Sequence, residues 1–101
     1  MADNMTLTRS REKALRTMAH GRKPIICIGQ KGLTGNVLAE IEAALQHHGL
    51  IKVKLRVGDR KVRNAMIEDL CARTGAVSVQ RIGNIVVLYR MNQDNPKIIS
   101  H

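Results

Sequence analysis

The residues with the clearest potential for chemistry are two glycines that enclose a cation, in the segment Gly29-Gln30-Lys31-Gly32. Because glycine has no Cβ, a backbone built from it can adopt positive φ and approach a ligand closely. The segment lies between a predicted strand and a predicted helix, and the N–H groups that begin a helix favour an anion. Lys31 adds a full positive charge, so the segment suits a phosphate group. Two glycines also mark many connections that bind nothing, and that interpretation stays open.

Positive charge dominates the rest of the chain. Seventeen Lys and Arg residues against eight Asp and Glu residues give a net charge of +9 over 101 residues. Such an excess favours a polyanionic partner, nucleic acid first and an anionic membrane surface second. The candidate contact residues, besides the glycine segment, are Arg9, Lys13 and Arg16 along one helix face, Arg22 and Lys23 in a connector, and Lys52, Lys54 and Arg56 on alternate positions of a strand. Each row also fits a surface that faces only solvent.

Aromatic and nucleophilic residues narrow the chemistry further. Tyr89 is the single aromatic residue in the sequence, and we expect it to be partly buried with its hydroxyl at the rim. Stacking of bases on an aromatic platform is therefore excluded, which leaves phosphate contacts as the main expected interaction. Cys27 and Cys71 form no C-x-x-C pair and are predicted to be small buried residues. Because the sequence contains no nucleotide-binding glycine motif, catalytic triad, carboxylate pair or metal spacing, we expect no enzyme, metal or cofactor.

Apolar periodicity predicts the elements that must position these residues. Helices are expected from Thr8 as the cap to about residue 20, over 35–47 and over 60–73, and strands over 25–28, 50–57, 77–82 and 85–90. The last two strands form a hairpin at Gly83-Asn84. The order α-β-α-β-α-β-β predicts a single-domain α/β sandwich with a mixed four-stranded sheet. The inward residues are expected to include Ala14, Leu15 and Met18, both faces of strand 25–28, and Val62, Met66, Ile67 and Leu70.

Several blocks of this sequence resemble one known family. They are KPIICIGQKGLT (23–34), LAEIEAAL (38–45), HGLIKVK (48–54), TGA (74–76) and GNIVVLYR (83–90). Their order and spacing resemble the CRM domain, and more closely the stand-alone bacterial YhbY-like proteins, over about residues 7–90. The resemblance implies a fold similar to the C-terminal domain of translation initiation factor three. It also implies RNA binding through the G-x-x-G loop and association with precursors of the large ribosomal subunit.

We therefore expect a non-catalytic RNA-binding protein that binds ribosomal RNA and assists ribosome assembly. We expect a monomer. We expect it in the cytoplasm, because the chain begins without a secretory signal pattern and no apolar stretch is long enough to cross a bilayer. Residues 91–101 form a polar, aperiodic tail that is expected to be mobile. The alternative is a basic scaffold that docks on an acidic protein or on double-stranded DNA, with the glycine loop serving only as a connector.

Overall fold

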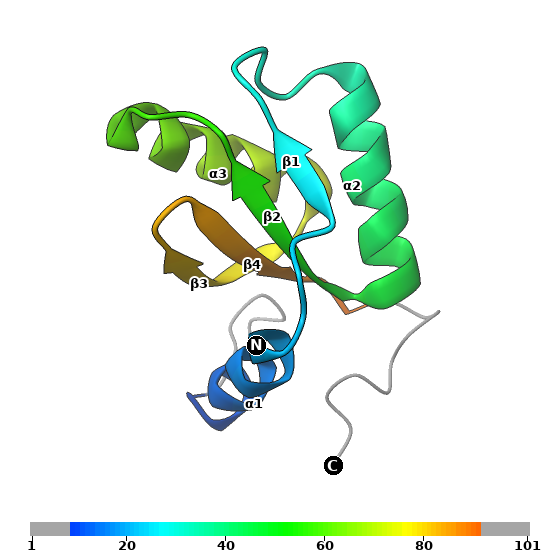
Figure 1. The fold of residues 1–101 in the computed structure, drawn as a ribbon. Coiled ribbons are helices and arrows are strands. Elements are labelled where there is room, and N and C mark those ends of the chain that lie inside the picture. The colour runs from blue at the N-terminus through cyan, green and yellow to red at the C-terminus, as the bar shows by residue number, and fades with distance from the viewer. Residues whose placement is uncertain (1–8, 92–101) are drawn as a thin grey trace.

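A computed structural model describes residues 9–91, which fold into three helices and four strands (Figure 1). The elements follow the predicted α-β-α-β-α-β-β order. They are α1 (Arg9–His20), β1 (Ile26–Ile28), α2 (Gly35–His48), β2 (Leu50–Leu55), α3 (Arg60–Thr74), β3 (Val77–Ile82) and β4 (Ile85–Tyr89). The predicted cap Thr8 and nearly all of the predicted tail lie outside the described residues. The fold class predicted from the sequence is confirmed.

The four strands form one mixed sheet in the order β1-β2-β4-β3. β1 runs parallel to β2, whereas β4 is antiparallel to both β2 and β3. β2 ends at Leu55, two residues earlier than predicted. The Leu55 amide donates to the carbonyl of Asn84 at 2.7 Å, and Asn84 already belongs to the turn between β3 and β4. The antiparallel ladder therefore has no further strand residue to pair with β2.

The two faces of the sheet are covered unequally. On one face, α2 and α3 bury the larger apolar cluster, which includes Ile28, Ile41, Val53 and Leu70. On the other face, α1 covers a smaller cluster. That cluster contains Leu15, Ala19, Leu50, Val79, Val87 and Tyr89 and takes no residue from β1. In Figure 1, α1 accordingly lies at one end of the sheet, and no described helix covers the α1 side of β1 or of the end of β2.

This unequal cover corrects several predictions about the interior. Cys27 is exposed and Ile25 is 51% exposed, because β1 is an edge strand that is packed by a helix on one face only. Ala14 is exposed as well, and the inward residue of α1 is Ala19, four positions after Leu15. Val62 is 46% exposed because the packed stripe of α3 begins one turn later.

Tyr89 is more enclosed than predicted. Its side chain lies in the cluster under α1 and is 4% exposed. Its hydroxyl is buried and has no hydrogen-bond partner among the described residues. The hydroxyl therefore does not lie at the rim, because α1 closes over this end of β4.

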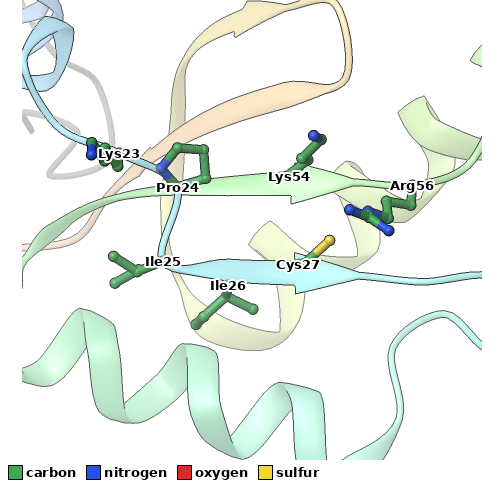
Figure 2. A pocket seen from close by; sticks show the side chains of 7 residues that line it. All are labelled: Lys23, Pro24, Ile25, Ile26, Cys27, Lys54 and Arg56. Carbon is green, nitrogen blue, oxygen red and sulfur yellow. The ribbon is translucent and has the colours of Figure 1, made fainter.

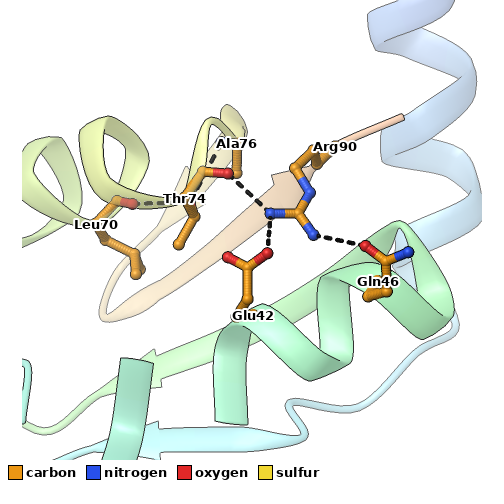
Figure 3. Close-up of polar contacts among 6 residues, drawn as sticks. All are labelled: Glu42, Gln46, Leu70, Thr74, Ala76 and Arg90. Carbon is orange, nitrogen blue, oxygen red and sulfur yellow. Dashed lines mark hydrogen bonds and ion pairs between the residues drawn. The ribbon is translucent and has the colours of Figure 1, made fainter. Parts of the chain in front are cut away.

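A polar contact fastens the ends of both helices on the larger cluster to β4. Figure 3 shows the guanidinium of Arg90 between α2 and the end of α3. Its Nη1 donates to Oε2 of Glu42 at 2.7 Å and to the carbonyl of Thr74 at 2.9 Å, and its Nη2 donates to Oε1 of Gln46 at 3.3 Å. The Arg90 amide also donates to the carbonyl of Gly49 at 2.8 Å. This contact therefore lies beside the start of β2.

Candidate nucleic-acid interface

The segment Gly29–Gly32 forms a closed turn between β1 and α2. The Gly32 amide donates to the carbonyl of Gly29 at 3.0 Å, and the Thr34 amide donates to the carbonyl of Gly32 at 3.0 Å. Gln30 and Lys31 lie at the tip of the turn and are exposed. The sequence therefore placed Lys31 correctly at the exposed end of a strand-to-helix connection.

The two glycines of this turn have different roles. Gly32 has a φ of 79°, a conformation that residues with a Cβ rarely adopt. Gly29 does not have positive φ, so only one of the two glycines uses this conformational freedom. A Cβ at Gly29 would meet nothing within 4 Å, so the space beside this backbone is open. Gly32 therefore shapes the turn, whereas Gly29 leaves the main chain accessible.

The start of α2 adds to an environment that suits a phosphate group. Thr34 caps the helix, because its side-chain oxygen accepts from the Val37 amide at 3.2 Å. The first turn of α2 contains no acidic residue. The partial positive charge of this helix end is therefore not offset by a carboxylate in that turn.

The end of β2 and the start of α3 lie beside the glycine turn. Because β1 and β2 are parallel, their carboxyl ends meet at the same edge of the sheet, and the Arg56 amide donates to the carbonyl of Ile28 at 2.7 Å. α3 also runs close to the turn, since a Cβ on Gly32 would lie 3.8 Å from Cε of Met66. The glycine turn, Arg56 and, through the short connection that follows Arg56, the start of α3 therefore lie along one edge of the sheet, which we call the loop edge.

The loop edge contains cations that the sequence analysis missed. Arg60 and Lys61 are exposed in the first turn of α3. Asp59 caps this helix by accepting from the amides of Lys61 at 2.8 Å and Val62 at 3.2 Å, but the first turn contains no acidic residue. Cations at a helix start are electrostatically unfavourable. The Asp59 carboxylate already supplies one negative charge at this helix end, and Arg60 and Lys61 remain exposed beside it.

Lys54 of β2 and Arg56 just beyond its end line the part of the sheet that α1 leaves open, whereas Lys52 lines a neighbouring hollow with Arg22. Lys54 pairs with Cys27 of β1 in the parallel register, so their side chains lie on the same face. An open hollow of about 400 Å³ lies over this pair of strands (Figure 2). It is lined by Lys23, Pro24, Ile25, Ile26, Cys27, Lys54 and Arg56. The structure thus brings Lys23 close to Lys54 and Arg56, although Lys23 lies far from both in the sequence.

The other predicted cations are placed less favourably for a joint site. Arg22 is half-buried, and its Nη1 donates to the carbonyl of Leu50 at 2.7 Å, so it helps to hold the connector against β2. In α1, Arg9 and Lys13 are exposed, whereas Arg16 pairs with Glu12 at 3.7 Å. α1 packs on Leu50, at the opposite end of β2 from Arg56. The α1 row and the loop edge therefore remain separate surfaces.

Other kinds of site are not found within residues 9–91. No group of three or more His, Cys, Asp or Glu side chains in this range is arranged to hold a metal ion. The helices of this range are also too short or too polar to cross a membrane. The basic surfaces are thus the arrangement from which a function can be argued.

The fold and the loop edge define a small α/β domain with a basic glycine turn between its first strand and the helix that follows. The chain belongs to the CRS1 / YhbY (CRM) domain family, whose model matches residues 7–90. It is 44% identical over 89 residues to a Haemophilus influenzae protein named "RNA-binding protein", covering 88% of this chain and 90% of that one. It is 40% identical over 97 residues to "Probable RNA-binding protein PA4753" of Pseudomonas aeruginosa, covering 96% and 93% respectively.

A solved structure shows the same architecture. The solution structure of the Staphylococcus aureus protein SAV1595, described as a candidate RNA-binding protein, superimposes with a TM-score of 0.80. The two sequences are 33% identical, and the match covers 94% of this chain and 98% of that protein. The predicted family and fold are therefore both confirmed.

Proposed function

We propose that this protein is a non-catalytic RNA-binding protein that binds ribosomal RNA in precursors of the large ribosomal subunit and assists their assembly in the cytoplasm. The observation that carries the proposal is the loop edge, where Arg56 is bonded beside an accessible glycine turn and a short connection leads to the cations at the start of α3. The RNA-binding names of the relatives support the same partner.

Phosphate groups are the chemistry that this edge recognises. The main chain is accessible at Gly29, the start of α2 adds partial positive charge, and Lys31, Arg60 and Lys61 add full charges. The proposed contact residues are Gly29, Gln30, Lys31 and Gly32, with Lys23, Lys52, Lys54 and Arg56 on the open sheet face and Arg9, Lys13, Arg16 and Arg22 as peripheral contributors. Binding that depends on phosphates weakens steeply as salt concentration rises.

A pair of charge-removing variants tests the loop. Lys31→Gln removes one exposed charge at the tip of the turn. Arg73→Gln removes one exposed charge near the end of α3, where Arg73 pairs with Asp69 at 3.1 Å. We expect Lys31→Gln to weaken binding to fragments of large-subunit ribosomal RNA and to reduce the slope of log K against log salt by about 0.7 to 0.9. Arg73→Gln should leave the slope unchanged, and equal slopes in both variants would remove the loop from the interface.

Two further measurements address the partner itself. Sedimentation of cell extracts should show the protein with large-subunit precursors, and a distribution restricted to other particles or to the free fraction contradicts the ribosomal part. Competition with double-stranded DNA of equal length addresses the alternative of a general basic scaffold. If the DNA displaces ribosomal RNA fragments as effectively as RNA does, the RNA-specific part of the proposal fails.

A further inference from the structure

The hollow on the open sheet face is lined by both apolar and cationic residues. Pro24 is exposed and Ile25 is 51% exposed, and both belong to a lining that also contains Lys23, Lys54 and Arg56. Figure 2 shows Pro24, Cys27, Lys54 and Arg56 around the same space over β1 and β2. The lining includes no acidic side chain. The hollow therefore offers an apolar floor within a positively charged rim.

The chemistry of this lining fits one nucleoside with its neighbouring phosphates. A volume of about 400 Å³ is sufficient for a ligand of that size. The guanidinium of Arg56 is a planar cation, and bases that have left a helical stack pack against such planes as they do against aromatic rings. Lys23 and Lys54 provide point charges for the phosphates on either side. A base held in a duplex is stacked on both faces and cannot enter such a hollow.

We propose that this hollow receives one unstacked nucleoside of a single-stranded RNA segment. Its base packs against the plane of Arg56 beside Cys27, Pro24 bounds the other end of the hollow, and its phosphates lie near Lys23 and Lys54. The inference rests on the proposed RNA-binding function and assigns the base-dependent part of that binding to this hollow. The glycine turn and the start of α3 then hold phosphates only, and the main-chain bond from Arg56 to Ile28 places the hollow next to the glycine turn.

Cys27 provides a chemical reporter at this position. Its thiol is exposed and lies in the lining, whereas Cys71 is only partly exposed. In the full chain carrying Cys71→Ala, the rate at which N-ethylmaleimide alkylates Cys27 can be followed by mass spectrometry. A single-stranded RNA present at about ten times its Kd should slow alkylation about tenfold, because only the free protein then reacts. The RNA duplex of the same sequence, at the same multiple of its own Kd, should leave the rate nearly unchanged.

The outcomes separate this inference from the proposed function. Bound single-stranded RNA that leaves Cys27 fully reactive overturns the hollow as a nucleoside site. Equal protection by the duplex overturns it as well, because the contact then needs no unstacked base. If none of the RNAs binds measurably, the proposed function itself fails.

A second variant separates stacking from charge. Arg56→Lys keeps the positive charge and removes the planar group, at an exposed position just beyond the end of β2. We expect about a fivefold to tenfold loss of affinity for single-stranded RNA, close to the loss of one stacking contact. Affinity for a ribose-phosphate oligomer of equal length without bases should not change, and neither should the salt dependence. An equal loss for both ligands, or no loss for either, contradicts the proposal.

Discussion

The main-chain amide of Arg56 donates a 2.7 Å hydrogen bond to the carbonyl oxygen of Ile28. Ile28 is the last residue of β1 and is followed directly by the glycine turn, whereas Arg56 follows the last residue of β2. This single bond therefore holds the glycine turn and the connection to α3 at the same edge of the sheet. It also places Arg56 at the point where the glycine turn adjoins the open sheet face.

Alanine at the two glycines of the turn should separate folding from binding. Gly32→Ala forces a residue with a Cβ into φ near 79°, so we expect it to lower the free energy of unfolding by about 1 to 2 kcal/mol. Gly29→Ala meets no neighbouring atom and should change stability little, while its Cβ obstructs access to the turn and weakens RNA binding. Urea denaturation and fluorescence anisotropy with labelled RNA measure the two effects. Equal destabilisation by both substitutions would contradict the assigned roles.

Neutral residues at the start of α3 should act in opposite directions on stability and binding. Arg60→Gln and Lys61→Gln each remove a cation from the positive end of a helix, which should stabilise the fold by about 0.3 to 1 kcal/mol. The same substitutions should weaken RNA binding, because the charges lie on the loop edge. Thermal unfolding and RNA titrations on the same samples provide the comparison. RNA affinity that stays constant in the double variant would exclude α3 from the interface.

Loss of Arg90 should affect stability without affecting RNA binding. The Arg90 side chain is 16% exposed and bonds both Glu42 and the Thr74 carbonyl, at the end of the sheet away from the glycine turn. Arg90→Ala leaves that carbonyl without its side-chain donor and should cost about 1 to 3 kcal/mol in chemical denaturation. Glu42→Gln is the matched variant and should cost less than about 1 kcal/mol, because Glu42 is 53% exposed. An RNA affinity reduced by either substitution, in folded protein, would contradict this separation.

Alkaline pH should destabilise the protein partly through Cys71. Burial raises the pKa of the Cys71 thiol above its ordinary value of 9.0, against smaller opposing effects of Arg81 and the Ser78 main chain. The folded state therefore keeps this proton at a pH where the unfolded state loses it, so the contribution is complete below about pH 9 and disappears as pH rises through the folded-state pKa.

Thermal unfolding between pH 7 and pH 10 measures this dependence. Cys71→Ala should show a shallower loss of Tm above pH 9 than the parent protein. Burial also raises the pKa of Tyr89 above 10.0, so a residual decline at higher pH is expected in both proteins. Parallel curves for the two proteins between pH 9 and pH 10 would show that Cys71 does not contribute.

Local signals in the sequence were sufficient to predict the elements and their order. Thr34 and Asp59, residue types that favour helix caps, do cap α2 and α3, and Gly49 and Gly75 follow helix ends with φ of 76° and 75°. The alternation of Lys52, Val53 and Lys54 correctly separated the two faces of β2. These features depend on neighbours within a few residues along the chain, and pattern reasoning detects such neighbours.

Burial was less predictable, because it depends on which elements cover one another. Cys27 reads as a buried residue within an apolar run, yet it is exposed because α1 packs on Leu50 and not on β1. Arg60 and Lys61 read as an ordinary polar helix start, yet they lie on the loop edge because β1 and β2 are parallel neighbours. Strand pairing and helix placement are set by long-range packing, which no local window contains.

The sequence by itself thus determined the glycine turn with its exposed lysine, the basic character, and the succession of helices and strands, all of which follow from local backbone preference and periodicity. Only the tertiary structure decided which basic residues act together. It joined Lys23 to Lys54 and Arg56 around one hollow, left Arg22 holding the connector, and placed the α1 row on a separate surface. The physical reason is that α1 packs on Leu50 and Tyr89 at one end of its face of the sheet, and the uncovered part can remain open to water because Lys54 and Arg56 lie on it.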